Sequence, residues 1–333
     1  SWSSISSAFR RCRVAPDISG VRILGETVVA EVERAVVGKT ELLNHLLACF
    51  LAGGHVLLED YPGLGKTLIA KSLASALGLE FRRIQFTPDL LPADITGTYV
   101  FSRNSDSFEL RRGPIFTNIL LGDEINRASP RTQSALLESM QEHQVTLEGE
   151  SIRLPDPFVV IATQNPIEYE GTFPLPEAQL DRFMMRLQVG YPSIEQEQEI
   201  LNRRRTRQSE ELEISQVVRP EQLAAARQAV ETVHVDSDIE RYIVQLASAT
   251  RRDPRVAVGA SPRGALALMK SSRAWAAIQG RNYVLPDDVK RLATPALVHR
   301  LLLQPEFWLK KNAPEDVIEA SLAAVPVPVL EGI

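Results

Sequence analysis

The chain has little of several features that would place it in a specialised class of protein. Only 2 of its 333 residues are cysteines, Cys12 and Cys49, and by themselves they cannot form a disulfide framework or a zinc site. No apolar run approaches the about 20 residues that a membrane-spanning helix needs. The first residues also lack the apolar segment of a signal peptide. We therefore expect a cytoplasmic protein with ordinary hydrophobic cores.

An excess of positive charge is also missing, because 37 Lys and Arg stand against 42 Asp and Glu, giving a net charge of −5. Surfaces that bind duplex nucleic acid are usually basic, so this balance disfavours them. The basic stretch at residues 202–207 is explained better by a solvated helix end than by a nucleic-acid contact. The five histidines show no metal-ligand spacing, and His45, in an apolar helical stretch, is expected to be a core or interface residue.

The chain does contain a phosphate-binding pattern. An apolar run at residues 55–58, predicted to be a buried strand, leads into a glycine-rich turn and then into a helical stretch at residues 68–74. In such a loop the backbone N–H groups and the helix N-terminus surround an anion. The predicted nucleotide-binding residues of the loop are Pro62, Gly63, Leu64, Gly65, Lys66, Thr67 and Leu68.

Two side chains of this loop are expected to act on the nucleotide. Lys66 would neutralise charge on the β- and γ-phosphates, and the Thr67 hydroxyl would ligate Mg²⁺. Asp60 stands where the strict pattern has its first glycine, which is a departure from the pattern. A glycine-rich surface turn without a ligand is the competing interpretation of the loop.

A second pattern strengthens the prediction of a nucleotide site. The apolar residues 119–121 are followed by two adjacent carboxylates, Asp123 and Glu124. Roughly 55 residues separate Lys66 from Asp123, enough for a helix and another strand of a parallel sheet. Asp123 would then hold Mg²⁺ through water, and Glu124 would orient or deprotonate the attacking water, at the edge where the phosphate loop lies. A solvated strand end is the alternative.

The order of apolar segments predicts an α/β fold with a parallel sheet and helices on both of its faces. Expected strands lie at residues 55–58, 81–86, 117–121, 158–162 and 184–189. Beyond residue 191 we expect only helices, at residues 194–205, 220–232, 237–250, 262–279 and 286–303. The predicted divisions are an N-terminal arm at 1–20, an α/β nucleotide-binding core at 21–191, and a small all-α lid domain with a C-terminal tail at 192–333.

Two hairpins are predicted to interrupt the first domain. Residues 98–111 and residues 145–154 each show two short alternating segments around a polar turn. Such projections grip a partner or mediate assembly, and a purely structural role is the alternative.

The motifs together resemble the MoxR family of AAA+ ATPases. The resemblance covers about residues 20 to 305 and is carried by residues 121–128, 130, 132–133, 136–138, 140, 162–166, 171–183 and 259–263. It implies an α/β AAA+ P-loop domain followed by a helical lid, with ATP and Mg²⁺ as cofactors.

The resemblance also implies roles for residues outside the two motifs. Asn165 is similar to the sensor-1 residue that positions the attacking water, and a turn-forming asparagine is the alternative. Arg182 is similar to the arginine finger supplied to the neighbouring subunit, and an ion pair with Asp181 or another acid is the alternative. Arg263 is similar to sensor 2, in cis or in trans, while Arg127 is a weaker candidate for a contact across the interface.

Further implications concern the adenine and the assembly. Val36, Val37 and Gly38 resemble the segment that covers the adenine, and the two hairpins resemble the helix-2 insertion and the pre-sensor-1 hairpin of the family. The resemblance implies a homo-oligomeric ring, a hexamer, that remodels or matures protein complexes. It also implies a von Willebrand factor A domain partner, with metal or cofactor insertion as one task.

Two other functions remain open at this stage. One is a nucleic-acid-stimulated AAA+ motor of the same branch, which the acidic composition disfavours. The other is a nucleotide-dependent interaction module that does not hydrolyse ATP. The second is disfavoured by the full set of expected catalytic residues, Lys66, Thr67, Asp123, Glu124, Asn165 and Arg182.

Overall fold

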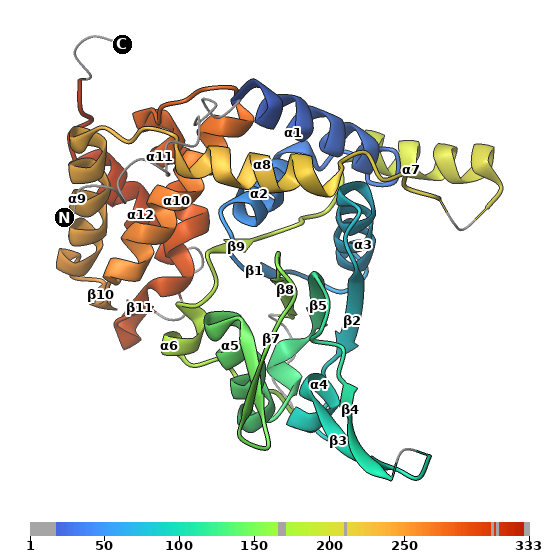
Figure 1. Ribbon diagram of the computed structural model, residues 1–333. Coiled ribbons are helices and arrows are strands. Elements are labelled where there is room, and N and C mark those ends of the chain that lie inside the picture. Colours follow the sequence, from blue (N-terminus) through green and yellow to red (C-terminus); the bar gives the residue numbers. More distant parts are fainter. Residues whose placement is uncertain are drawn as a thin grey trace, which may run out of the picture.

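A five-stranded parallel sheet forms the centre of the molecule, with strands in the order β2-β5-β8-β1-β9 (Figure 1). This computed structural model describes residues 18–104, 106–165, 171–209, 212–307, 310 and 313–329. The strands are β1 Val56–Glu59, β2 Phe81–Gln85, β5 Ile119–Asp123, β8 Val159–Gln164 and β9 Met185–Leu187. The five predicted strands and the α/β fold class are confirmed.

Apolar residues on the two faces of this sheet belong to two separate cores, because successive side chains of a strand point to opposite faces. In β5, Ile119 and Leu121 lie in one buried cluster and Leu120 lies in the other. The larger cluster includes residues of α1 Ile18–Glu33, α2 Thr40–Leu51 and α3 Lys66–Leu77. The smaller one includes residues of α5 Pro130–Glu142. The sheet is therefore covered on both faces.

The helical stretch predicted at residues 68–74 corresponds to α3, and the apolar helical stretch that contains His45 corresponds to α2. Since α1 begins at Ile18, the last residues of the predicted 1–20 arm are helical, and the rest of the arm lies outside the described residues. Three further helices had not been predicted from the sequence: α4 Pro92–Thr96, α5 and α6 Glu177–Leu180.

The C-terminal half is mainly helical, as predicted, and several helices begin with their own caps. Ser193, Asp236 and Ser261 each accept a hydrogen bond from a backbone N–H at the start of the helix that follows. The helices are α7 Ile194–Arg207, α8 Pro220–Glu231, α9 Ser237–Arg252, α10 Pro262–Ile278, α11 Pro286–Leu297 and α12 Ala313–Ala324.

Two predictions for this half were wrong. It does contain strands, because β10 Val256–Val258 pairs antiparallel with β11 Leu302–Leu303. The helix predicted at 286–303 ends at Leu297, and the short 3-10 helix Val298–Arg300 follows it. Strands of two or three residues are too short to show a period in the sequence. The chain leaves the helix where His299 and Arg300 bind carbonyl groups of the segment before β9.

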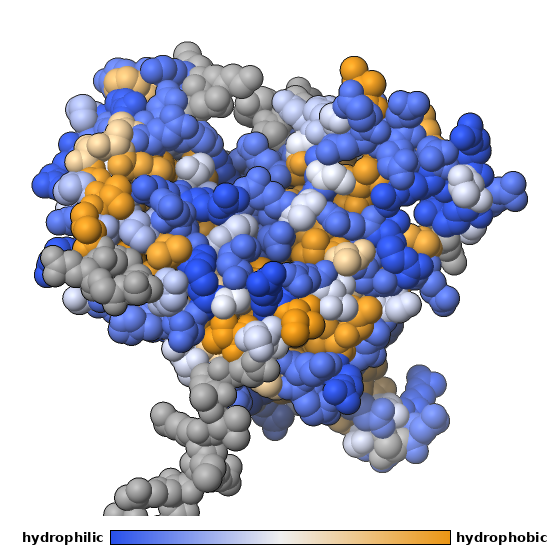
Figure 2. Space-filling view, turned by 90° about the horizontal axis from the view of Figure 1, so that it is seen from above, coloured by the Kyte–Doolittle hydropathy of each residue, from blue (hydrophilic) through white to orange (hydrophobic). Residues whose placement is uncertain are grey.

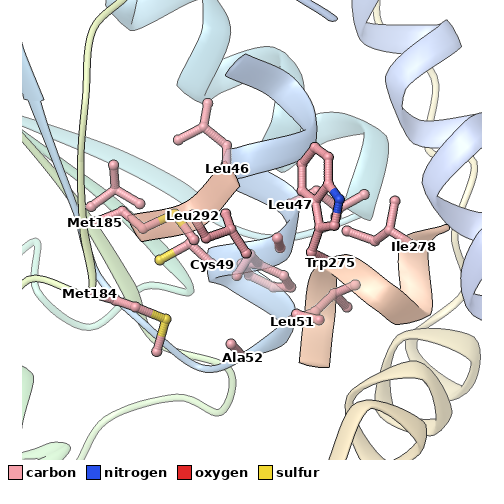
Figure 3. Close-up of a cluster of buried hydrophobic side chains, with 14 of the residues drawn as sticks. Leu46, Leu47, Cys49, Leu51, Ala52, Met184, Met185, Trp275, Ile278 and Leu292 are labelled. Atoms are coloured by element: carbon pink, nitrogen blue, oxygen red, sulfur yellow. The ribbon is translucent and has the colours of Figure 1, made fainter. Parts of the chain in front are cut away.

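The larger core joins the two halves of the chain. Figure 3 shows side chains of α2, among them Cys49, packed between Met184 and Met185 on one side and Trp275 of α10 on the other. Cys49 is fully buried, as expected of a core residue. His45 is also buried, with its ring 5.1 Å from that of Trp275. The division into domains at residue 191 therefore stays a prediction.

Both predicted hairpins are present. The first is β3 Gly97–Ser102 with β4 Ser107–Arg112, and it projects far from the body of the molecule (Figure 1). The second is β6 Gln144–Leu147 with β7 Glu150–Arg153. The Tyr99 hydroxyl donates a hydrogen bond to Glu150 Oε2 at 2.9 Å, so the two hairpins touch.

The face of the molecule in Figure 2 is mostly hydrophilic, and its apolar residues lie in separate patches. Within the described ranges no helix has both the length and the apolar character needed to cross a membrane.

Candidate nucleotide-binding site

The glycine-rich loop connects β1 to α3 and leaves an open space over its backbone. Gly63 and Gly65 both have φ of +82°, a conformation that glycine adopts without the steric cost of a Cβ. No heavy atom would lie within 4 Å of a Cβ at either position. Lys66 Nζ donates to the carbonyl oxygens of Asp60, at 2.7 Å, and Tyr61, at 3.2 Å. The loop therefore has the open, glycine-dependent geometry that a phosphate cradle requires.

Asp60, the departure from the strict loop pattern, has a structural explanation. It is buried, and its carboxylate accepts hydrogen bonds from the backbone N–H of Tyr61 at 2.8 Å and of Gly190 at 2.6 Å. Lys39 Nζ donates to the carbonyl oxygens of Val189 and Gly190 at 2.8 and 2.9 Å. The phosphate loop is thereby joined to the segment that leads into α7.

The acidic strand end lies at the same edge of the sheet. Asp123 closes β5, and its carboxylate is 2.6 Å from Arg83 Nη2 and 2.6 Å from the donating hydroxyl of Thr163. The same Thr163 oxygen accepts a hydrogen bond from the Glu124 N–H at 2.8 Å. Thr163 of β8 thus fixes both acidic residues relative to the neighbouring strand.

Glu124 has an unusual backbone conformation for a residue other than glycine. Its φ of +58° lies in the left-handed region, which costs about 1–3 kcal/mol and is found preferentially at functional sites. Its carboxylate accepts hydrogen bonds from Gln85 at 2.7 Å and from Arg127 at 3.0 Å. Arg127, the weaker interface candidate, therefore contacts Glu124 of its own chain.

The loop and the acidic residues lie close enough to interact. Burial lowers the pKa of Lys66, whereas the nearby carboxylates of Asp123, Asp60 and Glu124 act to raise it. Asn165 follows β8, the strand between β1 and β5, and is buried. The fold therefore gathers the candidates for phosphate, Mg²⁺ and water contacts at one sheet edge.

A cavity of about 520 Å³ adjoins the loop. Its lining includes Val37, Gly65, Leu68 and, from the α7 side, Ile200 and Leu201. The apolar members provide a surface for a base. Gly38 does not line this cavity, although it lies one residue from Val37, and instead borders a neighbouring one.

Arg182 and Arg263 lie together elsewhere. Both line a cavity of about 330 Å³ that also includes Lys270 and shares no lining residue with the cavity at the phosphate loop. Arg182 Nε is buried with no hydrogen-bond partner in the described parts of the chain. The carboxylate of Asp181, the alternative partner considered for Arg182, binds Arg300 at 2.7 Å instead.

Sequence reasoning missed several residues of the site. Arg83 and Gln85 of β2 and Thr163 of β8 contact Asp123 or Glu124, and Arg300 contacts Asp181. The sequence around a polar residue on a strand does not indicate which residue of the neighbouring strand its side chain will contact. Only the position of Thr163 within the motif at residues 162–166 marked it at all.

The residues present fit Mg²⁺ and a nucleotide. Mg²⁺ prefers hard oxygen ligands such as the Thr67 hydroxyl and the Asp123 carboxylate. The ammonium group of Lys66 now binds carbonyl groups of its own loop and can turn to a phosphate. The fold and the site therefore define a P-loop nucleotide-binding protein with a helical C-terminal half.

Comparisons with known proteins identify the family. Residues 55–185 match the ATPase family associated with various cellular activities (AAA), and residues 248–321 match the AAA lid domain. The chain is 41% identical to chaperone MoxR1 of Mycobacterium tuberculosis, over 92% of this chain and 83% of that protein. It is 32% identical to protein MoxR of Paracoccus denitrificans, over 90% and 95%. The chain belongs to the MoxR family of AAA+ ATPases.

Two further similarities agree with this assignment. A crystal structure of a candidate ATPase from Cytophaga hutchinsonii superposes with a TM-score of 0.88 at 39% identity, covering 94% of this chain and 97% of the other. The magnesium-chelatase 38 kDa subunit of Rhodobacter capsulatus is 32% identical over 88% of this chain and 83% of that protein.

Proposed function

We propose that this chain hydrolyses ATP at the edge of the sheet where the phosphate loop and the acidic strand end meet. The observation that carries the proposal is the parallel pairing of β8 with both β1 and β5, because it brings the phosphate loop after β1 and Asp123 and Glu124 at the end of β5 to one edge of the sheet. Lys66 and the backbone N–H groups of the loop would bind the β- and γ-phosphates. Thr67 and Asp123 would hold Mg²⁺, which neutralises phosphate charge as the bond to the leaving group breaks.

The proposed roles at the γ-phosphate follow from the strand ends. Glu124 would accept a proton from the attacking water, and Asn165 would orient that water. The role of Glu124 is supported by its position, because its backbone conformation and the hydrogen bonds from Gln85 and Arg127 fix where its carboxylate lies. Val37, Leu68, Ile200 and Leu201 would contact the base in the adjoining cavity.

Arg182 and Arg263 are proposed to complete the site of a neighbouring subunit. They line a cavity separate from the phosphate loop of their own chain, which favours action of both in trans. A guanidinium in that position stabilises charge on the transferred phosphoryl group. Such sharing requires assembly of several subunits, and we propose a ring, a hexamer. This proposal rests on the geometry and on membership of the AAA+ family.

A subunit-mixing experiment tests hydrolysis in trans. Lys66→Ala removes the phosphate contact but keeps the arginines, whereas Arg182→Ala does the reverse. Each variant alone should lose ATPase activity, and the loss in Arg182→Ala should reach several orders of magnitude, as expected of an arginine finger. The mixture of the two variants should recover activity. A mixture of Lys66→Ala with Glu124→Gln is the control, because both changes damage the same half of the site and no intact site can form. If the mixture of Lys66→Ala and Arg182→Ala does not recover activity, the proposal of a site shared between subunits is contradicted.

We further propose that hydrolysis drives remodelling of a bound protein, as a chaperone does. A relative is named chaperone MoxR1 and another is a magnesium-chelatase subunit. These names support a role in maturing protein complexes. As finer proposals, we add a partner with a von Willebrand factor A domain and a task in metal insertion. The nucleic-acid motor is not favoured, since no relative reported above carries such a name.

A further inference from the structure

The segment that carries Arg182 is held on both sides by residues that follow α11. Arg300 Nε donates to Asp181 Oδ1 at 2.7 Å, and its Nη2 donates to the backbone oxygens of Asp181 at 3.1 Å and Phe183 at 2.8 Å. His299 Nε2 also lies 2.9 Å from the Phe183 oxygen. The backbone on either side of Arg182 is therefore fixed by the C-terminal half of the chain.

Asp181 also binds the start of α10, where Arg263 lies. The Ser261 hydroxyl is 3.2 and 3.1 Å from the two carboxylate oxygens of Asp181, and Arg263 Nη1 is 3.8 Å from one of them. Ser261 is the N-cap of α10 and Arg263 is in its first turn. One carboxylate thus connects the segment of Arg182 to the helix of Arg263.

The Arg300 end of this connection is buried and closely packed, whereas the Arg263 side chain is half exposed. The Arg300 side chain is only 2% exposed, and that of Asp181 is 20% exposed. A Cβ at Gly264 would lie 3.0 Å from Arg300 Cδ, so the glycine leaves room for the arginine stem. Burial lowers the pKa of Arg300, and Asp181 opposes that shift. A planar guanidinium can bind a carboxylate and two carbonyl groups at once, which the single ammonium of lysine does poorly.

We propose that Arg300 is a positioning residue that holds Arg182 and Arg263, through Asp181, as one cationic unit. The inference rests on the proposed function, in which this unit is presented to the nucleotide of a neighbouring subunit. Because the unit is fixed to α10 and α11, a movement of the C-terminal half would move both arginines together. Because the Arg300 side chain is only 2% exposed, we expect it to act through Asp181 and the neighbouring backbone.

The first test separates positioning from nucleotide binding. Arg300→Met should lower kcat roughly 10- to 100-fold, the penalty of displacing a catalytic group by about 1 Å. The affinity of the same subunits for a fluorescent ADP analogue should stay unchanged, because Arg300 and the phosphate loop of its chain line separate cavities. Arg300→Lys should be impaired less, since it keeps the charge. A wild-type kcat in Arg300→Met would overturn the proposal.

Arg281→Met is the matched control. Arg281 binds the buried Asp288 through two hydrogen bonds of 2.7 and 2.6 Å, but it follows the opposite end of α10 from Ser261. Loss of this ion pair should cost stability without lowering kcat. Equal kcat losses in the two variants would mean that Arg300 acts only through general stability, and the proposal would fail.

The second test uses subunit mixing. Arg300→Met subunits keep an intact phosphate loop, so Lys66→Ala subunits, which keep a well-positioned Arg182, should restore their activity. If Arg300→Met with Lys66→Ala stays inactive while Arg182→Ala with Lys66→Ala recovers, only the proposed role of Arg300 is overturned. If both mixtures stay inactive, the proposal of a site shared between subunits is contradicted as well. Ser261→Ala, which removes the hydroxyl contact to Asp181 and the N-cap hydrogen bond from the Gly264 N–H, should show a smaller kcat loss with the same recovery. It replaces Arg300→Met if that protein does not fold.

Discussion

At the scale of single residues, several polar groups are buried because they join segments that are distant in the sequence. His55 is an example, since its Nδ1 accepts a hydrogen bond from the Val160 N–H at 3.0 Å and its Nε2 lies 3.0 Å from the Met140 oxygen. Only the neutral ring, protonated at Nε2, can satisfy both contacts. His55 therefore links β1, β8 and the end of α5, and its protonation must disturb all three.

This arrangement predicts a loss of stability at mildly acidic pH. Burial lowers the pKa of His55 to about 4, below the ordinary 6.5. Between pH 4 and 6.5 the unfolded chain therefore binds more protons at His55 than the folded chain does. The contribution of His55 to the free energy of unfolding is complete above pH 6.5 and is lost as the pH falls toward 4. The difference corresponds to about 3 kcal/mol. Urea unfolding at pH 7, 6 and 5 measures it.

His55→Gln is the matched variant for that measurement. Burial also lowers the pKa values of His45 and His299, so some dependence on pH should remain in the variant. Its free energy of unfolding should nevertheless fall less steeply between pH 7 and 5 than that of the wild type. An unchanged slope would show that His55 does not contribute.

At the scale of elements, the two hairpins depend on glycine for different reasons. Gly97 begins β3 with φ of +89°, and a Cβ there would lie 2.3 Å from the Arg111 oxygen and 2.5 Å from the Gly113 nitrogen. Gly149 in the turn of the second hairpin has φ of +84°, but open space surrounds its missing Cβ. The first position is restricted by packing and by backbone conformation, and the second by backbone conformation alone.

Alanine at the two glycines should therefore have unequal effects. Gly149→Ala should cost about 1–2 kcal/mol, the usual penalty of a left-handed residue with a Cβ. Gly97→Ala should cost more, by about 1–3 kcal/mol, because backbone atoms must also move. Urea unfolding of both variants gives the comparison, and equal losses would mean that the hairpin base adjusts freely.

At the scale of the whole molecule, residues of the proposed nucleotide site line two separate cavities of one chain. The phosphate loop lies at one cavity, and Arg182 with Arg263 lies at another. A single chain therefore cannot close the proposed site by itself. Assembly, hydrolysis and movement of the C-terminal half are expected to depend on one another.

The proposed remodelling can be tested with a protein that binds ATP but hydrolyses it slowly. Glu124→Gln should retain protein clients from a lysate of its native host when ATP is present and release them when ATP is omitted. A nuclease-treated sample serves as the control. Protein bands that survive the nuclease would support remodelling of protein complexes. Capture of nucleic acid, with protein bands lost after nuclease treatment, would contradict it.

The sequence by itself determined the local features. Apolar runs marked the five strands, and glycine with Lys66 and Thr67 marked the phosphate loop, because strand burial and loop geometry depend on neighbouring residues. Only the tertiary structure decided which distant groups meet. It placed Thr163 against Asp123, Asp60 against Gly190, and Arg300 against Asp181. Such contacts leave no periodic trace in the sequence, since each joins segments whose register is set by packing of the whole fold.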